Sequence, residues 1–305
     1  MKVFLTGATG FIGSQLVKRL LADGHEVAIL VRKESRLDVL QAVLPKIAVH
    51  LHDGGYPSVH AALAQAQPDI VCHVASLFLA QHKPDDVSRL IDSNLGMPTQ
   101  LLEAMQQLGL RRLINTGTSW QHFEDHAYNP VNLYAATKQA FEDLLAYYVA
   151  AHGFQAITLK LFDTYGPGDT RPKLFSLLRK TARSGDTLRM SPGQQLLDLV
   201  YIDDVLDAYL LAMHRLPSVL GAECYAVSNP ERLSLQELVQ VYGTTVGKNL
   251  QVEWGGLPYR ARETMRPSTR HPRLPGWQPR VALSQGIARM ESDALVDGLL
   301  VGQSE

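Results

Sequence analysis

The chain alternates short, continuously apolar runs with longer segments in which apolar residues recur every three or four positions. The short runs predict buried strands, and the longer segments predict helices. The predicted strands span residues 3–6, 26–31, 47–51, 69–75, 112–116 and 156–161, and the clearest predicted helices span 12–23, 87–108 and 134–152. Continuously apolar strands that alternate with helices are typical of a parallel sheet covered on both faces. We therefore expect an α/β fold with a Rossmann-type doubly wound parallel sheet.

A glycine-rich turn joins the first predicted strand to the first predicted helix. Its sequence is Gly7-Ala8-Thr9-Gly10-Phe11-Ile12-Gly13. Glycines at this spacing allow a tight turn, a close approach of backbone to a pyrophosphate, and close packing of helix on strand. The helix start then offers unpaired N–H groups and the positive end of its dipole to the phosphates. The turn predicts a dinucleotide cofactor held by Gly7, Thr9, Gly10, Phe11, Ile12 and Gly13.

The end of the second predicted strand should contact the adenosine ribose of that cofactor. An acidic residue there binds the 2′-hydroxyl of NAD, whereas an arginine accommodates the 2′-phosphate of NADP. The chain has Arg32 and Lys33 at this position and no acidic residue before Glu34. We therefore expect NADP(H) to be favoured over NAD(H); a solvated basic turn is the alternative interpretation.

A tyrosine and a lysine, Tyr134 and Lys138, lie four residues apart on one face of a predicted helix. A tyrosine acts as an acid or base near neutral pH when its pKa, ordinarily about 10, is lowered. A neighbouring ammonium has that effect, so we expect Lys138 to lower the pKa of Tyr134 and also to hold the nicotinamide ribose. A hydroxyl at the end of the fifth predicted strand should bind the substrate oxygen. The candidates are Thr116, Thr118 and Ser119.

The regular alternation of strands and helices ends after about residue 165. Gly- and Pro-containing turns at 166–168 and 191–193, and a stretch rich in Pro and Arg at 258–279, interrupt it. We expect residues 1–165 to form the dinucleotide-binding Rossmann domain, with 196–227 returning to it. Residues 166–195 and 228–305 are expected to form a smaller C-terminal α/β lobe that binds the substrate.

Composition excludes several classes of partner. The formal net charge of −1 at pH 7 gives no basic surface for nucleic acid. No run approaches the roughly 20 apolar residues of a membrane span, and the start of the chain lacks the features of a secretory signal. The two cysteines, Cys72 and Cys224, have no metal-ligand spacing. We expect a cytoplasmic protein with no metal, no nucleic-acid partner and no membrane association.

Several of these motifs together resemble the extended short-chain dehydrogenase/reductases of the NAD-dependent epimerase/dehydratase family. The resemblance covers essentially the whole chain. It rests on the glycine-rich turn, the Tyr134/Lys138 pair, Tyr165-Gly166-Pro167, His73-Val74-Ala75-Ser76, 199–205 and Gly276-Trp277-Gln278-Pro279. It implies that Thr118, Tyr134 and Lys138 are the catalytic trio. It also implies that the cofactor site includes Asp53, Ala75 and Asn94.

Within the family, residues 116–122 and 128–134 are most similar to CDP-abequose synthase-type nucleotide-sugar 4-ketoreductases, which act in deoxysugar biosynthesis. Sugar 4,6-dehydratases of the family have Asp-Glu directly after the catalytic threonine, where this chain has Ser119 and Trp120. The resemblance implies NADPH-dependent reduction of a 4-keto-hexose nucleotide, with Tyr134 as proton donor. The alternatives are an NAD-dependent nucleotide-sugar 4-epimerase and a non-catalytic NADP-sensing protein.

The expected substrate contacts are less regular. The family often has an arginine where Leu197 stands, and this arginine binds the diphosphate of the substrate. A diphosphate needs basic partners, so other basic residues should take the place of this arginine. The expected substrate-binding residues are Ser119, Trp120, Asp163, Arg171, Lys173 and Arg262, with Arg260 and Arg266 as further basic candidates.

The two long predicted helices, 87–108 and 134–152, carry apolar residues on more than one side. A helix that is apolar all round is buried. The resemblance implies that these helices pair across the axis of a homodimer; coverage by the C-terminal lobe of the same chain is the alternative.

Overall fold

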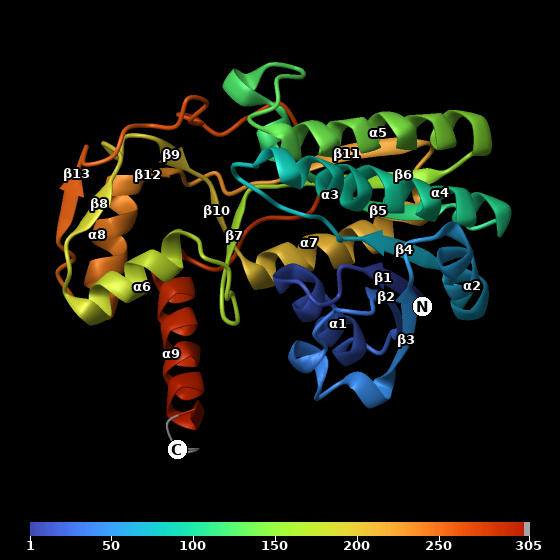
Figure 1. The fold of residues 1–305 in the computed structure, drawn as a ribbon, viewed down its shortest axis with the longest axis horizontal. Coiled ribbons are helices and arrows are strands. Elements are labelled where there is room, and N and C mark those ends of the chain that lie inside the picture. Colours follow the sequence, from blue (N-terminus) through green and yellow to red (C-terminus); the bar gives the residue numbers. More distant parts are fainter. Residues whose placement is uncertain (302–305) are drawn as a thin grey trace.

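A seven-stranded parallel sheet forms the centre of the protein (Figure 1). The computed structural model describes the backbone of residues 1–301 and the side chains of residues 1–292. The strand order is β11-β6-β5-β4-β1-β2-β3, and each neighbouring pair is parallel. The strands are β1 (Lys2–Thr6), β2 (Glu26–Arg32), β3 (Ile47–His52), β4 (Ile70–His73), β5 (Arg112–Thr118), β6 (Gln155–Leu161) and β11 (Ala222–Val227). The predicted Rossmann-type α/β fold is confirmed.

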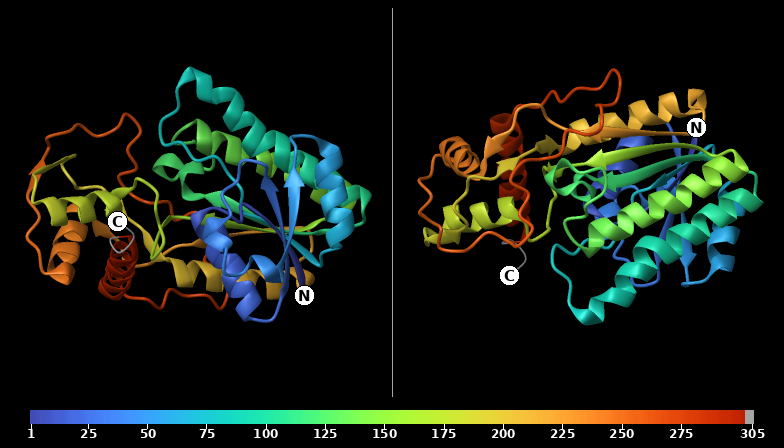
Figure 2. Two further views of the ribbon diagram at one scale, coloured as in Figure 1. Left: turned by 60° about the horizontal axis from the view of Figure 1, so that its bottom comes forward. Right: turned by 90° about the horizontal axis from the view of Figure 1, so that it is seen from above.

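Helices cover both faces of this sheet (Figures 1 and 2). On one face lie α1 (Phe11–Ala22) and α7 (Ile202–Arg215), and on the other lie α2 (Tyr56–Ala66), α4 (Met97–Gln107) and α5 (Leu133–His152). Side chains of a strand alternate between the faces. Val3 and Leu5 of β1 therefore join the core under α1, whereas Phe4 joins the core under α4 and α5. None of the described helices could cross a membrane.

The predicted helix 87–108 is interrupted. A short helix, α3 (Val87–Ile91), continues into a π-helical turn (Asp92–Gly96) before α4 begins. Pro98, in the first turn of α4, has no N–H to donate to a regular helical ladder. The wide turn buries Asn94, whose side chain bonds the backbone N–H and C=O of Leu77 and the hydroxyl of Thr137. Single π-turns of this kind are frequent at functional sites.

Beyond residue 165 the chain builds a second group of elements, at the left of Figure 1. The helices there are α6 (Leu174–Ser184), α8 (Leu235–Val246) and α9 (Leu283–Val301). The strands pair in twos: β7 (Asp163–Tyr165) with β10 (Leu199–Tyr201), β9 (Leu196–Leu197) with β12 (Leu233–Ser234), and β8 (Leu188–Met190) with β13 (Val252–Trp254).

Residues 196–227 return to the main sheet in part. Of the described strands beyond residue 165, β11 is the one that joins it, beside β6. Residues 196–201 contribute β9 and β10, which pair with β12 and β7 outside the main sheet. The division into a Rossmann domain and a substrate-binding lobe stays a prediction, and residues 302–305 of that lobe lie outside the described residues.

Candidate active site

A cavity of about 1140 Å³ opens at the carboxyl ends of the central strands. Ligands of doubly wound sheets bind at this edge. Most of the predicted site residues line the cavity. They are Gly7, Thr9, Gly10, Phe11, Ile12, Gly13, Arg32, Lys33, Asp53, Ala75, Thr118, Ser119, Trp120, Tyr134, Lys138, Asp163, Arg171 and Lys173. Asn94 and Arg262 are not among the lining residues.

The glycine-rich turn has the shape of an anion cradle. Gly7 has φ +79°, and a Cβ atom there would lie 2.5 Å from the backbone nitrogen of Ala75. A Cβ atom on Gly13 would overlap the carbonyl oxygen of Gly7. Gly10 begins α1 without a side-chain cap, and the first turn contains no acidic residue. The N–H groups of that turn are therefore free to bind an anion. The residues of the glycine-rich turn fit the pyrophosphate of a dinucleotide.

The end of β2 presents two basic side chains to the same cavity. Arg32 and Lys33 are exposed and line its wall. Within the described part of the chain, neither side chain forms an ion pair, although Glu34 lies beside them. Both cations are therefore available to a negatively charged group in the cavity.

Tyr134 and Lys138 lie in the first two turns of α5, and both are buried. Asn132 caps this helix by accepting a hydrogen bond from the N–H of Ala135 at 2.9 Å. The hydroxyl of Tyr134 is hydrogen-bonded to the side chains of Ser76 and Thr118. The geometry therefore brings the end of β5, the loop after β4 and the start of α5 to one point.

The three hydroxyl candidates at the end of β5 lie in different surroundings. The Thr116 hydroxyl donates to the carbonyl oxygen of His73 at 2.8 Å and lies 2.6 Å from the hydroxyl of Tyr209. Ser119 lines the cavity, but Thr118 is the candidate that contacts Tyr134. The geometry thus favours Thr118 as the hydroxyl that shares a substrate oxygen with Tyr134.

The expected lowering of the Tyr134 pKa was wrong. Burial raises the pKa of Tyr134 to about 12, and the hydrogen bonds from Ser76 and Thr118 and the charge of Arg171 oppose this rise. Burial also lowers the pKa of Lys138 to about 8. Desolvation disfavours the charged form of both groups and here exceeds the electrostatic effects. At neutral pH the site holds a protonated phenol and an ammonium.

Aromatic rings and cations surround the mouth of the cavity near Tyr134. The ring of Phe78 lies 5.0 Å from that of Tyr134 and 5.5 Å from that of Trp120. The ammonium of Lys173 lies 4.9 Å above Phe78. Ser76 and Phe78 were not predicted as site residues. Ser76 belongs to the family-like segment after β4, whereas no pattern in the sequence points to Phe78.

Arg171 lies between the glycine-rich turn and this aromatic group. It forms a two-pronged ion pair with Asp169, at 2.6 and 2.7 Å, and lies 4.7 Å above the ring of Phe11. The carboxyl group of Asp163 lies nearby, and its burial raises its pKa; Lys173 and Arg171 oppose the rise. Two basic side chains and one acidic side chain therefore line the part of the cavity expected to hold the substrate.

Two predicted contacts lie elsewhere. Asn94, which we expected at the cofactor, instead forms hydrogen bonds with the backbone N–H and C=O of Leu77, in the loop after β4. Arg262, expected at the substrate, donates to Asn129 and lies 4.3 Å above the ring of Phe123. An asparagine and an arginine are suitable residue types for the two expected contacts. Spacing along the chain, however, does not show the direction in which a side chain points. Among the described residues, no cluster of His, Cys, Asp or Glu could hold a metal ion.

Comparisons with known proteins identify the family of the chain. The model of the NAD dependent epimerase/dehydratase family matches residues 3–227. The chain is 27% identical to CDP-abequose synthase of Yersinia pseudotuberculosis, over 89% of this chain and 93% of the relative. It is 29% identical to UDP-glucose 4-epimerase of Mycolicibacterium smegmatis, over 95% of this chain and 97% of the relative.

A solved structure is similar over nearly the whole chain. The UDP-glucose 4-epimerase of Thermus thermophilus, in complex with NAD, superimposes with a TM-score of 0.81 and 26% identity, covering 96% of this chain and 98% of its own. A nicotinamide dinucleotide cofactor is thereby supported, but the expected preference for NADP is not. The predicted resemblance is confirmed: the chain belongs to the NAD dependent epimerase/dehydratase family, the extended short-chain dehydrogenase/reductases that act on nucleotide sugars.

Proposed function

We propose that the protein is an NADPH-dependent 4-ketoreductase of a nucleotide-activated hexose. The observation that carries this proposal is the chemistry around Tyr134. The buried phenol is protonated at neutral pH and is bonded to Thr118. The next two residues on the wall, Ser119 and Trp120, carry no carboxyl group for the elimination of water. The similarity to CDP-abequose synthase supports the same reaction class.

In the proposed reaction the residues of the cavity have separate roles. When bound, the reduced dinucleotide supplies the hydride. Thr118 and Tyr134 donate hydrogen bonds to the C4 oxygen of the sugar, and Tyr134 transfers its proton as negative charge develops there. Lys138 holds the nicotinamide ribose and keeps a positive charge near the reacting oxygen. Phe78 and Trp120 shield the sugar from water.

Basic side chains at the same end of the cavity would bind the diphosphate of the substrate. Lys173 and Arg171 line the wall, and a diphosphate requires such partners. They would take the place of the arginine that the family often has at Leu197. We also propose that Ser119, Trp120 and Asp163 contact the sugar.

The reaction is tested directly with purified protein, NADPH and a nucleotide-activated 4-keto-6-deoxyhexose. We expect one molecule of NADPH to be consumed per sugar reduced, measured as the loss of nicotinamide absorbance. UDP-glucose serves as the control, since it has no ketone and should consume no NADPH. A protein that interconverts C4 epimers without net cofactor consumption would overturn the proposal.

A nucleotide-sugar 4-epimerase is the second candidate. Two observations favour it: 29% identity to UDP-glucose 4-epimerase of M. smegmatis, and the structural similarity to an epimerase in complex with NAD. Firmly retained NAD would accept the hydride from C4 and return it, while the same Thr118, Tyr134 and Lys138 would remove and restore the proton of the C4 hydroxyl. A non-catalytic NADP-sensing protein has no need of the buried Tyr134/Lys138 pair; dinucleotide binding without turnover would favour it.

The cofactor preference is tested at Arg32. We expect Arg32→Ala to weaken NADPH binding by about 10- to 100-fold, because a charge-assisted hydrogen bond to the 2′-phosphate is worth about 1.5–3 kcal/mol. NADH binding should stay unchanged. Titration followed by nicotinamide fluorescence measures both. Arg36→Ala is the matched control, since Arg36 is exposed and paired with Asp38. Equal affinities of the Arg32 variant and the native protein for NADPH would contradict the preference.

The remaining expectations stay proposals. We propose a homodimer formed through α4 and α5, where Leu144 and Tyr147 are exposed. We also propose a cytoplasmic location.

A further inference from the structure

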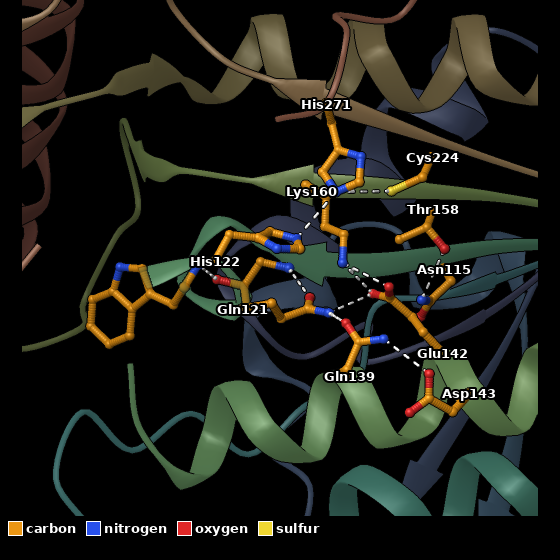
Figure 3. Close-up of polar contacts among 12 residues, drawn as sticks. Asn115, Gln121, His122, Gln139, Glu142, Asp143, Thr158, Lys160, Cys224 and His271 are labelled. Carbon is orange, nitrogen blue, oxygen red and sulfur yellow. Dashed lines mark hydrogen bonds and ion pairs between the residues drawn. The ribbon is translucent and has the colours of Figure 1, made fainter. Parts of the chain in front are cut away.

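A buried ion pair lies against the sheet just behind the catalytic end of β5 (Figure 3). The ammonium of Lys160, on β6, donates to both carboxylate oxygens of Glu142, on α5, at 2.8 and 2.7 Å. Their side chains are only 2% and 16% exposed. Lys160 is the cross-strand neighbour of Gly117, the residue directly before Thr118. The pair is therefore one residue away from the proposed catalytic hydroxyl.

Gln121 connects this ion pair to the backbone of Thr118. Its side-chain oxygen accepts a hydrogen bond from the N–H of Thr118 at 3.0 Å. Its amide nitrogen donates to Gln139 at 2.7 Å and to Glu142 at 3.1 Å. Gln121 is fully buried, so these bonds are made away from water. The position of Thr118 thus depends on Gln121, and the orientation of Gln121 depends on Glu142.

The packing around Gly117 leaves little freedom to this arrangement. A Cβ atom at Gly117 would lie 2.8 Å from Cδ of Lys160 and 2.9 Å from a carboxylate oxygen of Glu142. The ion pair therefore packs directly against the strand, and glycine is the residue that allows this approach.

Glu142 also lies one helical turn beyond Lys138, so the two side chains share a face of α5. The titratable groups that face Lys138 are Tyr134 and Glu142 on α5, Lys160 on β6 and His73 on β4. Burial and the charge of Lys138 lower the pKa of His73 well below its usual value, so His73 is neutral. Glu142 raises the pKa of Lys138, and Lys160 lowers it.

Stability alone gives a weak reason for this pair. Removing two charges from water costs about as much as their attraction returns, so a buried ion pair contributes little net stability to a fold. Here each partner has a separate connection to the proposed site: Lys160 to Gly117, and Glu142 to Gln121 and Lys138.

We propose that Glu142, Lys160 and Gln121 are positioning residues: the ion pair controls the charge of Lys138, and Gln121 fixes the catalytic strand end at Thr118. This inference rests on the proposed function in assigning Lys138 to the cofactor ribose. None of the three residues lines the cavity, so each acts through a neighbour.

The proposal is tested by removing the negative charge of Glu142 in one variant and the positive charge of Lys160 in another. If the site requires the ammonium form of Lys138, turnover is full below its pKa and is lost as pH rises through it, near pH 8 in the native protein. Glu142→Gln should move the midpoint of this loss to lower pH by about one unit, and Lys160→Met should move it to higher pH. A purely structural role lowers activity in both variants without moving the midpoints in opposite directions, and that result would overturn the proposal.

Two controls separate charge from packing. Lys160→Arg keeps the positive charge and should keep the native midpoint. Gln121→Met removes the three side-chain hydrogen bonds of Gln121 without changing any charge. The kcat should fall by about tenfold at an unchanged midpoint, because the backbone N–H of Thr118 loses its buried partner. A shifted midpoint in either control would contradict the assignment.

A second measurement does not depend on turnover. Fluorescence titration with the reduced dinucleotide across the same pH range reports on Lys138 through its contact with the ribose, and its midpoints should move as above. If Glu142→Gln does not fold, the neutral pair Glu142→Gln/Lys160→Met replaces it; its midpoint should move to lower pH, because Glu142 has the larger effect on Lys138. An unmoved or raised midpoint would refute the proposal. Normal dinucleotide binding without reduction of any keto sugar would end the proposed function and leave this test intact.

Discussion

Replacing Tyr134 with phenylalanine is expected to lower kcat by about 100- to 10,000-fold, the usual contribution of a positioned general acid. The substitution removes one hydroxyl and keeps the ring that packs against Phe78. The hydroxyl is the group that contacts Thr118, and burial holds its pKa at about 12, so it carries a proton throughout the neutral range. NADPH consumption measures the loss. Dinucleotide affinity, measured by fluorescence titration, should change little, because the cradle at Gly7 is untouched.

Tyr209→Phe is the matched control for this prediction. Tyr209 is also fully buried, and its hydroxyl lies 2.6 Å from that of Thr116 on the same strand as Thr118. Its loss should cost about 1 kcal/mol of stability, the usual value of one hydrogen bond, and leave kcat near the native value. Near-normal turnover by the Tyr134 variant, or an equal loss in both variants, would show that Tyr134 is not the proton donor.

The parts of the site that the sequence predicted are those that depend on local spacing. The glycine-rich turn and the Tyr134/Lys138 pair each lie within one strand–turn–helix unit or one helix face, so their geometry follows from their separation along the chain. The apolar strands likewise predicted the parallel sheet, because their burial on both faces gives them continuous apolar runs.

The parts that the sequence did not predict depend on register between distant segments. Lys160 meets Gly117 because β6 pairs with β5 in one particular register, and no pattern within either strand indicates it. Asn94 lies in the π-helical turn and bonds Leu77 and Thr137 rather than lining the cavity. The pKa of Tyr134 was predicted in the wrong direction, since charge proximity can be inferred from spacing but burial cannot.

The second large effect is expected at the glycine-rich turn. Gly7→Ala should weaken dinucleotide binding by at least about 100-fold. A left-handed backbone costs an alanine about 1–2 kcal/mol, and Gly7 has φ +79°. The larger obstacle is steric: the new Cβ would lie 2.5 Å from the nitrogen and 2.7 Å from Cα of Ala75. These are backbone atoms of the segment that lines the cavity, so the turn and that segment must separate, and the cradle widens.

Gly24→Ala isolates the steric effect from the backbone strain. Gly24 has the same φ of +79°, in the turn after α1, but a Cβ atom there has no neighbour within 4 Å. Both variants have the same backbone strain, and Gly7→Ala should lose more stability in thermal unfolding because of its added clash. Only the Gly7 variant should lose affinity in fluorescence titrations with NADPH and NADH. If Gly24→Ala bound the dinucleotide as poorly as Gly7→Ala, general destabilisation would explain the loss. If Gly7→Ala bound it normally, the close approach to Ala75 would not be what forms the cofactor site.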